Sequence, residues 1–215
     1  MGFRKERFYT GGVYHVYNKS IEGFEIFRYS EEYVRMREVI RFYRDSVARH
    51  SYSISLKRVL GADDPVLHGS ERVRVIAYCL MPTHIHLLVI QTAENGVEDY
   101  MRLIQGSYAS YLNKKSKRKG PLWVGRFGAR HIGTDEDLWH MTRYIHLNPT
   151  SAGLVAYADD WEFSSHHEYC GANGKNPICD FKKLVPMTPA QYRKFVEDRA
   201  DYQRSLQIIK SHLMD

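Results

Sequence analysis

Three short stretches of the chain have patterns typical of β-strands, the first through alternation of its residues and the others through runs of apolar residues. The stretches are residues 8–20, residues 72–80 and the apolar run that begins at His84. Pro82 precedes the last run and lacks a backbone N–H, so we expect it in a tight turn rather than inside a strand. The second and third stretches therefore predict a hairpin that turns at residues 81–83.

Apolar positions that recur every three to four residues predict helices between and after these strands. Ser30 and Thr134 are the expected N-caps of two of these helices, and Pro149 is expected to end the second of them. The expected elements are helices over 30–48, 97–114, 135–147 and one or two within 188–212, a loop over 57–71 and a short strand near 52–56.

The bulk composition suits a soluble globular protein with a real core. The chain has 215 residues, of which 43% are hydrophobic and 26% charged, which fits one domain or one domain with an appendage. The net charge of +6 is compatible with a polyanionic partner but does not prove one. Cys79, Cys170 and Cys179 form no close pair, which indicates a reducing compartment. With no signal-peptide pattern and no run of about 18 apolar residues, we expect a cytoplasmic protein without a membrane span.

His84 and His86 are the first candidates for chemistry. Side chains two residues apart on a strand share a face, so the two imidazoles would project together. Such a pair can hold one metal ion, although a site needs a third ligand from elsewhere in the chain. Two half-buried strand histidines bonded to their neighbours explain the same pattern. His15 in the first strand has the same two interpretations, and the pattern favours an ordinary strand residue.

Positive charge is densest at residues 114–119, and arginines and aromatic residues follow it. A basic run stays solvated, but it can also contact a phosphate backbone. Aromatic rings interleaved with guanidinium groups suit stacking on unpaired bases. The candidate DNA-binding residues are Lys114, Lys115, Lys117, Arg118, Lys119, Trp123, Arg126, Phe127 and Arg130.

Tyr144 and Asn148 lie one turn apart at the end of the predicted helix over 135–147. A phenol and a carboxamide on one side of a helix end can serve as a nucleophile and a metal ligand. The alternative is a packed tyrosine and an asparagine that caps the helix. The spacing alone favours this alternative.

Several of these segments, in this order, resemble a known family. They are the His84-Ile85-His86 strand, the Trp123…Gly125-Arg126-Phe127 segment, and the stretch from Tyr144 through Asn148-Pro149 to Val155, with Tyr14–Asn18 and Trp161…Ser165 around them. Together they are similar to the single-strand HUH transposases of the insertion-sequence-200 type, and within these to the REP-associated tyrosine transposases. The resemblance covers roughly residues 8–170.

The resemblance implies an α+β, ferredoxin-like fold, with an antiparallel sheet, helices packed on one face and a helical C-terminal tail. It implies a catalytic domain over residues 1–170 and an appendage over 171–215. Carried over by motif position, His84 and His86 are metal ligands and Tyr144 is the nucleophile. Asn148 is the implied third ligand, at a place where many relatives carry the longer Gln.

The implied reaction is cleavage and rejoining of single-stranded or hairpin DNA through a 5′-phosphotyrosine. A covalent intermediate conserves the energy of the phosphodiester, so no nucleotide cofactor is expected. A divalent cation, Mg²⁺ or Mn²⁺, would stabilise the charge on the phosphate. Relatives include dimers and monomers, so we expect either a monomer or a homodimer, with DNA as partner and no membrane association.

Two rival functions fit the same residues. One is a sequence-specific DNA-binding regulator that retains the fold without strand cleavage. The other is a metal-dependent nuclease that uses water as nucleophile, with Tyr144 merely packed. A covalent protein–DNA adduct distinguishes the transposase chemistry from both.

Overall fold

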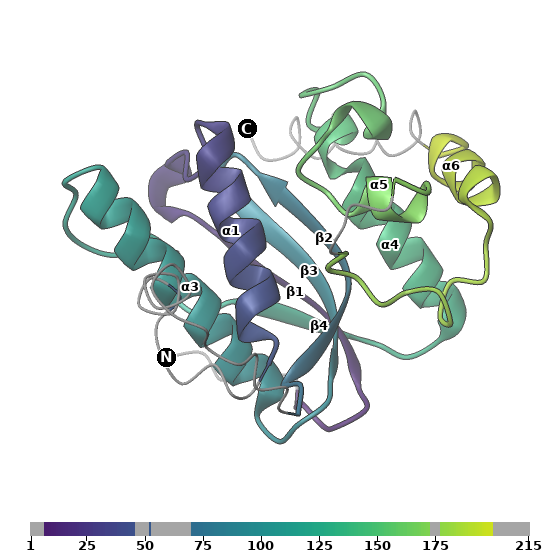
Figure 1. Cartoon of the computed structure of the whole chain (residues 1–215), viewed down its shortest axis with the longest axis horizontal. Coiled ribbons are helices and arrows are strands. Elements are labelled where there is room, and N and C mark those ends of the chain that lie inside the picture. The colour runs from purple at the N-terminus through teal and green to yellow at the C-terminus, as the bar shows by residue number, and fades with distance from the viewer. Residues whose placement is uncertain (1–6, 46–51, 53–69, 173–176, 200–215) are drawn as a thin grey trace, which may run out of the picture.

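A four-stranded antiparallel sheet forms the centre of the protein (Figure 1). The computed structural model describes residues 7–45, 52, 70–172 and 177–199. The strands, in the spatial order β2-β3-β1-β4, are β1 (Val13–Lys19), β2 (Val73–Met81), β3 (His84–Gln91) and β4 (Gly128–Ile132). Helix α1 (Ser30–Tyr43) joins β1 to β2, and helix α3 (Gly96–Lys115) joins β3 to β4. This order and connectivity confirm the predicted α+β, ferredoxin-like fold.

Both faces of the sheet are covered. Leu87 of β3 and Val16 of β1 belong to the core beneath α1 and α3, whereas Leu88 and Ile90 belong to a second core. Helix α4 (Asp135–Ser151) packs against this second face, so α1 and α3 lie on one side of the sheet and α4 on the other (Figure 1). The prediction that the helices pack on one face therefore holds for α1 and α3, whereas α4 packs on the opposite face.

The predicted hairpin is present. Met81 pairs with His84 across a turn made by Pro82 and Thr83. The Pro82 carbonyl accepts hydrogen bonds from the backbone N–H groups of Ile26 and Phe27, at 2.8 and 3.1 Å. The proline therefore sits where its missing N–H costs no sheet hydrogen bond, and the turn is tied to the chain ahead of α1.

Three predicted helix ends are wrong. The N-cap of α1 is Tyr29 rather than Ser30, and the Glu32 carboxylate accepts hydrogen bonds from the backbone N–H groups of Arg28 and Tyr29. Helix α4 begins at its predicted cap, since Thr134 Oγ1 accepts from the Asp137 N–H, but it continues through Pro149 to Ser151. Helix α1 ends at Tyr43, and residues 46–48 of the predicted helix lie outside the described residues.

The chain after α4 folds back over it. It contains two short helical turns, η2 (Ala158–Asp160) and α5 (His166–Tyr169), and the longer helix α6 (Pro189–Glu197). Phe181, Val185, Tyr192 and Val196 are buried in the same core as α4. A short 3₁₀ turn, η1 (Ile21–Gly23), follows β1.

Some expected features fall outside the described residues. These are the strand near 52–56 except residue 52, nearly all of the loop over 57–71, and residues 200–212 of the tail. The division into 1–170 and 171–215 stays a prediction. Within the residues that the structure describes, no helix has the length and apolar character needed to span a membrane.

Candidate functional site

The face of the sheet beneath α4 carries a polar patch near one end of β1 and β3. The register pairs His84 with Lys19 and His86 with Tyr17. His15 lies diagonally across from His86, and its Nε2 is 3.0 Å from His86 Nδ1. The His15 and His86 rings are nearly parallel, with centroids 5.2 Å apart. A pleated strand thus projects both predicted histidines to one face, as their spacing predicts.

Each histidine of the pair has its Nδ1 engaged. His84 Nδ1 lies 3.0 Å from Thr83 Oγ1, and His86 Nδ1 contacts His15 as described above. Among the described residues, neither Nε2 has a hydrogen-bond partner. The ring centroids of His84 and His86 are 5.0 Å apart. If Nδ1 donates its proton to these partners, Nε2 is left with a lone pair, which is how metal-binding imidazoles are commonly held.

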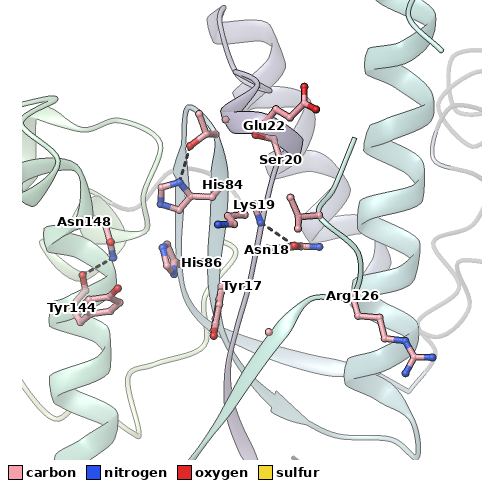
Figure 2. A pocket seen from close by; sticks show the side chains of 14 residues that line it. Tyr17, Asn18, Lys19, Ser20, Glu22, His84, His86, Arg126, Tyr144 and Asn148 are labelled. Atoms are coloured by element: carbon pink, nitrogen blue, oxygen red, sulfur yellow. Dashed lines mark hydrogen bonds between the residues drawn. The ribbon is translucent and has the colours of Figure 1, made fainter. Parts of the chain in front are cut away.

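Helix α4 brings Tyr144 and Asn148 to the same place (Figure 2). The ring centroid of Tyr144 is 5.9 Å from that of His86 and 6.0 Å from that of His15, both edge-to-face. Tyr144 is 39% exposed, so a substrate can reach the phenol, whereas Asn148 is buried. The two helix residues and the two strand histidines, which lie far apart in the sequence, therefore line one site.

The side-chain amide of Asn148 has a fixed orientation. Its Nδ2 donates to the Tyr144 carbonyl at 2.8 Å and to the Ile145 carbonyl at 3.4 Å. Because a carbonyl only accepts hydrogen bonds, the NH₂ end of the amide must face the helix. The Oδ1 atom is then the end available to a ligand. Asn148 is thus neither a C-terminal cap nor free to rotate.

These residues line a pocket of about 820 Å³. Its walls come from β1, the turn after it, the hairpin, the start of β4 and α4 (Figure 2). The lining residues are Tyr17, Asn18, Lys19, Ser20, Glu22, Gly23, Thr83, His84, His86, Val124, Arg126, Gly128, Tyr144 and Asn148. A Cβ on Gly128 would lie 2.4 Å from the Tyr17 ring, so glycine is needed for that ring to lie against β4.

Burial controls the protonation of the site. It lowers the pKa of His84, with help from Lys19, and it holds the pKa of His86 well below its usual range, with help from His15 and His84. The same effect, with Arg130, lowers the pKa of His15 to about 4. The imidazoles are therefore neutral near pH 7, as metal ligation requires. Burial and the nearby Tyr17 raise the pKa of Tyr144, so its phenol is protonated at rest.

The donor set fits a divalent cation. Two neutral imidazole nitrogens and an amide oxygen are ligands that Mn²⁺ accepts readily and Mg²⁺ less readily. Three protein ligands also leave positions open for substrate oxygens. His84, His86 and Asn148 are the residues that would hold the ion.

The basic residues among the predicted DNA-binding residues divide into two groups. Lys114, Lys117, Lys119, Arg126 and Arg130 are exposed, and Arg130 pairs with His15 across β1 and β4. Arg126 lines the pocket and points away from the histidines (Figure 2). Lys115 instead bonds Glu31 and Glu32, and Arg118 bonds Asn113 and the Pro121 carbonyl.

The two predicted stacking rings are buried. Trp123 is 9% exposed and donates from Nε1 to the Gln105 carbonyl, and Phe127 is 8% exposed and lies beside Phe8. Their faces pack in the core beneath α1 and α3. The structure therefore gives no support to base stacking by Trp123 and Phe127, which stays a prediction.

Sequence reasoning gave too little weight to β1. His15, Tyr17 and Lys19 face the site, and the predicted alternation had already put His15 and Tyr17 on one face. The pattern does not indicate which strand lies beside β1. The pairing of β1 with β3 supplies this information, because it sets Tyr17 beside His86.

Comparisons with known proteins agree with this fold. One solved structure, "Structure of the REP associates tyrosine transposase bound to a REP hairpin", matches with a TM-score of 0.57 and 20% identity, over 88% of this chain and 96% of that chain. A putative transposase from Deinococcus radiodurans R1 matches with a TM-score of 0.37 and 15% identity, over 66% of this chain and 95% of that chain. At these identities the first likeness establishes the shared fold. No curated protein matches the sequence.

A family model, described as "Transposase IS200 like", matches residues 39–148. The match covers just over half of the 215 residues and runs from within α1 to Asn148, so it includes both histidines of the hairpin and Tyr144. The chain belongs to the family of IS200-like transposases.

Proposed function

We propose that this chain is a metal-dependent transesterase that cleaves and rejoins single-stranded, hairpin-forming DNA through a 5′-phosphotyrosine. The single observation that carries the proposal is the meeting of α4 with the hairpin. Tyr144 and Asn148 face His84 and His86 across one pocket, with the Tyr144 ring 5.9 Å from His86. The solved relative of the same fold is described as bound to a REP hairpin, which supports a hairpin substrate here.

Tyr144 is the proposed nucleophile. Its Oη forms a bond to the scissile phosphorus while the bond from phosphorus to the 3′ oxygen breaks. The phenolic proton leaves Tyr144, and a proton is taken up by the departing 3′ oxygen, so the products are a 5′-phosphotyrosine and a free 3′-hydroxyl. The reverse step, with another 3′-hydroxyl as nucleophile, rejoins strands.

His84, His86 and Asn148 are the proposed metal ligands. A divalent cation bound there would stabilise the negative charge that develops on the phosphate oxygens. The exposed cations Lys114, Lys117, Lys119, Arg126 and Arg130 are proposed to contact the phosphate backbone, since such contacts supply most sequence-independent affinity. Because the pKa of Tyr144 is raised, the resting phenol is protonated and must lose its proton during the attack.

The deciding experiment mixes the protein with end-labelled hairpin DNA and Mn²⁺ or Mg²⁺, followed by denaturing electrophoresis. We expect a metal-dependent adduct in which label migrates with protein. Tyr144→Phe and His84→Ala should abolish it. Tyr17→Phe is the matched control, because Tyr17 is the other phenol that lines the pocket.

Three outcomes would contradict the proposal. An adduct that survives Tyr144→Phe and disappears in Tyr17→Phe would show that Tyr17, and not Tyr144, is the nucleophile. Cleavage without an adduct would indicate a nuclease that uses water. Tight hairpin binding with no cleavage under either metal would favour a DNA-binding regulator.

A further inference from the structure

A second cluster of metal-binding side chains lies outside the pocket. Asp159 belongs to η2, His166 begins α5, and Cys170 directly follows α5. One ligand atom from each of the three lies within 4.8 Å of the others. None of them lines the pocket beneath α4. His166 and Cys170 are four residues apart, a spacing that sets two side chains over one helical turn.

The distances within the cluster approach those of a tetrahedral zinc site. His166 Nδ1 lies 3.1 Å from Asp159 Oδ1 and 3.8 Å from Cys170 Sγ, and the same sulfur lies 3.5 Å from His166 Nε2, so the thiol must turn toward Nδ1 to share an ion with it. Zinc bonds of about 2.0–2.3 Å place tetrahedral ligand atoms roughly 3.3–3.8 Å apart. Two of the three edges are therefore close to the required length. The third, between Asp159 and Cys170, needs a closure of at most about 1 Å, within the range of a cysteine side-chain rotation.

The surroundings orient the ligands. The His166 side chain is 2% exposed, so its ring is held in place, whereas Asp159 is 36% exposed and gives solvent and ions a way in. Arg193 of α6 donates from Nε to Asp159 Oδ2 at 2.8 Å. The Asp159 carboxylate is thus anchored through one oxygen and presents the other to His166, as an outer-shell partner does for a metal ligand.

The neutral form of His166 suits metal binding, whereas the Cys170 thiol must lose a proton to act as a ligand. Burial lowers the pKa of His166 to about 4, so its imidazole is neutral with one lone pair available. Burial, with Asp159, raises the pKa of the Cys170 thiol to about 11. A thiolate at this position therefore needs a cation beside it.

We propose that Asp159, His166 and Cys170 form a binding site for a Zn²⁺-class cation, with one water as the fourth ligand. Binding displaces the thiol proton of Cys170 into solvent, and a thiolate–metal bond forms. Thiolate selects Zn²⁺ over the harder Mg²⁺ and Mn²⁺, whereas the pocket set of two histidines and an asparagine contains no sulfur. The bound ion would hold η2 against α5, and the bond from Arg193 to Asp159 would extend this link to α6.

Co²⁺ as a probe tests this site without any DNA. The full chain is stripped of metal under reducing conditions and titrated with Co²⁺, and the thiolate-to-Co²⁺ charge-transfer absorption in the near ultraviolet is recorded. We expect the band to saturate near one equivalent and to vanish when Zn²⁺ is added. Because the band requires sulfur, it reports on this cluster and not on the pocket. His84→Ala should leave the band unchanged, so failure of the proposed DNA chemistry would not alter it.

Variants of this cluster distinguish residues that bind the metal from residues that do not. Cys170→Ser should abolish the band, and Cys179→Ser, a change at the other half-buried cysteine, should retain it. Asp159→Asn and Arg193→Gln should retain the sulfur band while weakening Zn²⁺ binding, Arg193→Gln by roughly 10–100-fold as for loss of an outer-shell partner. Circular dichroism checks that each variant is folded. No band in the wild-type protein, or a band that persists in Cys170→Ser, would overturn the proposal.

Discussion

At the scale of single residues, Asn148 and Pro149 act together. Pro149 has no N–H, so the Ile145 carbonyl one turn earlier lacks its helical donor. The Asn148 amide reaches back to that carbonyl and to the Tyr144 carbonyl. The side-chain amide thus supplies a donor in place of the missing N–H of Pro149, and α4 continues through the proline. The same bonds leave Oδ1 of Asn148 facing away from the helix backbone. The Asn148 side chain that donates to these carbonyls is thus the one proposed to bind the metal.

His15 is the second residue whose role depends on a neighbour. It is 6% exposed, and its Nε2 faces His86 Nδ1 at 3.0 Å. If His86 Nε2 is to bind a metal, His86 Nδ1 must carry the proton and donate a hydrogen bond to His15 Nε2. His15 is therefore a positioning residue for the proposed site rather than a ligand.

Replacing His15 tests that positioning role. His15→Phe keeps a flat ring but removes the acceptor, so we expect Mn²⁺ affinity to fall by roughly 10–100-fold. His15→Gln offers an amide oxygen as acceptor and should recover much of that affinity. Titration calorimetry of the metal-free protein measures both variants. Equal losses in the two would mean that His15 only fills space.

At the scale of elements, a buried carboxylate ties α1 to α3. Glu32 caps the start of α1 through the N–H groups of Arg28 and Tyr29, and it binds Lys115 Nζ at 2.8 Å near the end of α3. The Glu32 side chain is 4% exposed. Its neighbour Glu31 binds the same Lys115 at 2.9 Å but is 66% exposed. The two acids thus share a partner and differ in burial.

This difference predicts unequal effects on stability. Glu32→Ala removes the acceptor for two backbone N–H groups and should lower the free energy of unfolding by about 1–2 kcal/mol. Glu31→Ala removes an exposed ion pair and should change it by less than about 0.5 kcal/mol. Urea unfolding of both variants at one pH measures the contrast. A larger loss in Glu31→Ala would contradict the greater contribution assigned to the buried Glu32 carboxylate.

Elements were more predictable than their contacts. Alternation and Pro82 gave the hairpin almost to the residue, because strand period and proline chemistry are local. Local rules placed the end of α4 wrongly, because the missing N–H of Pro149 is compensated by a side chain. Trp123 and Phe127 carry no local sign of burial, since a ring that stacks on a base and a ring that packs in a core have the same pattern. The contact of His15 with His86 joins strands that are distant in the sequence, so only the sheet reveals it.

At the scale of the whole molecule, one buried histidine connects α4 to the sheet and to the C-terminal segment. His146 of α4 is fully buried, with Nδ1 2.7 Å from the Tyr192 hydroxyl of α6 and Nε2 2.7 Å from Ser165 Oγ. Ser165 Oγ in turn accepts from the Tyr78 N–H of β2. One imidazole therefore links the sheet, α4 and the C-terminal segment.

This link should make the fold sensitive to acid. Burial, with His166 and His167 nearby, holds the pKa of His146 well below its ordinary value of 6.5. Below pH 6.5 the unfolded chain then binds a proton that the folded protein does not, so stability is fully present above that pH and is lost as the pH falls. For this one residue the loss is about 2 kcal/mol between pH 7.5 and 5.

A variant isolates that contribution from those of the other buried histidines. His146→Gln should be less stable than wild type at pH 7.5, because a buried hydrogen-bonding partner is lost, yet the gap should narrow by about 2 kcal/mol at pH 5 because no imidazole remains to be protonated. His140→Gln, at a side chain that is 48% exposed, is the matched control and should track the wild type at both pH values. Urea unfolding of metal-free protein measures the gap. A gap that does not change with pH would mean that His146 takes up its proton without unfolding the protein, and that the link between the sheet and α6 does not depend on its neutral form.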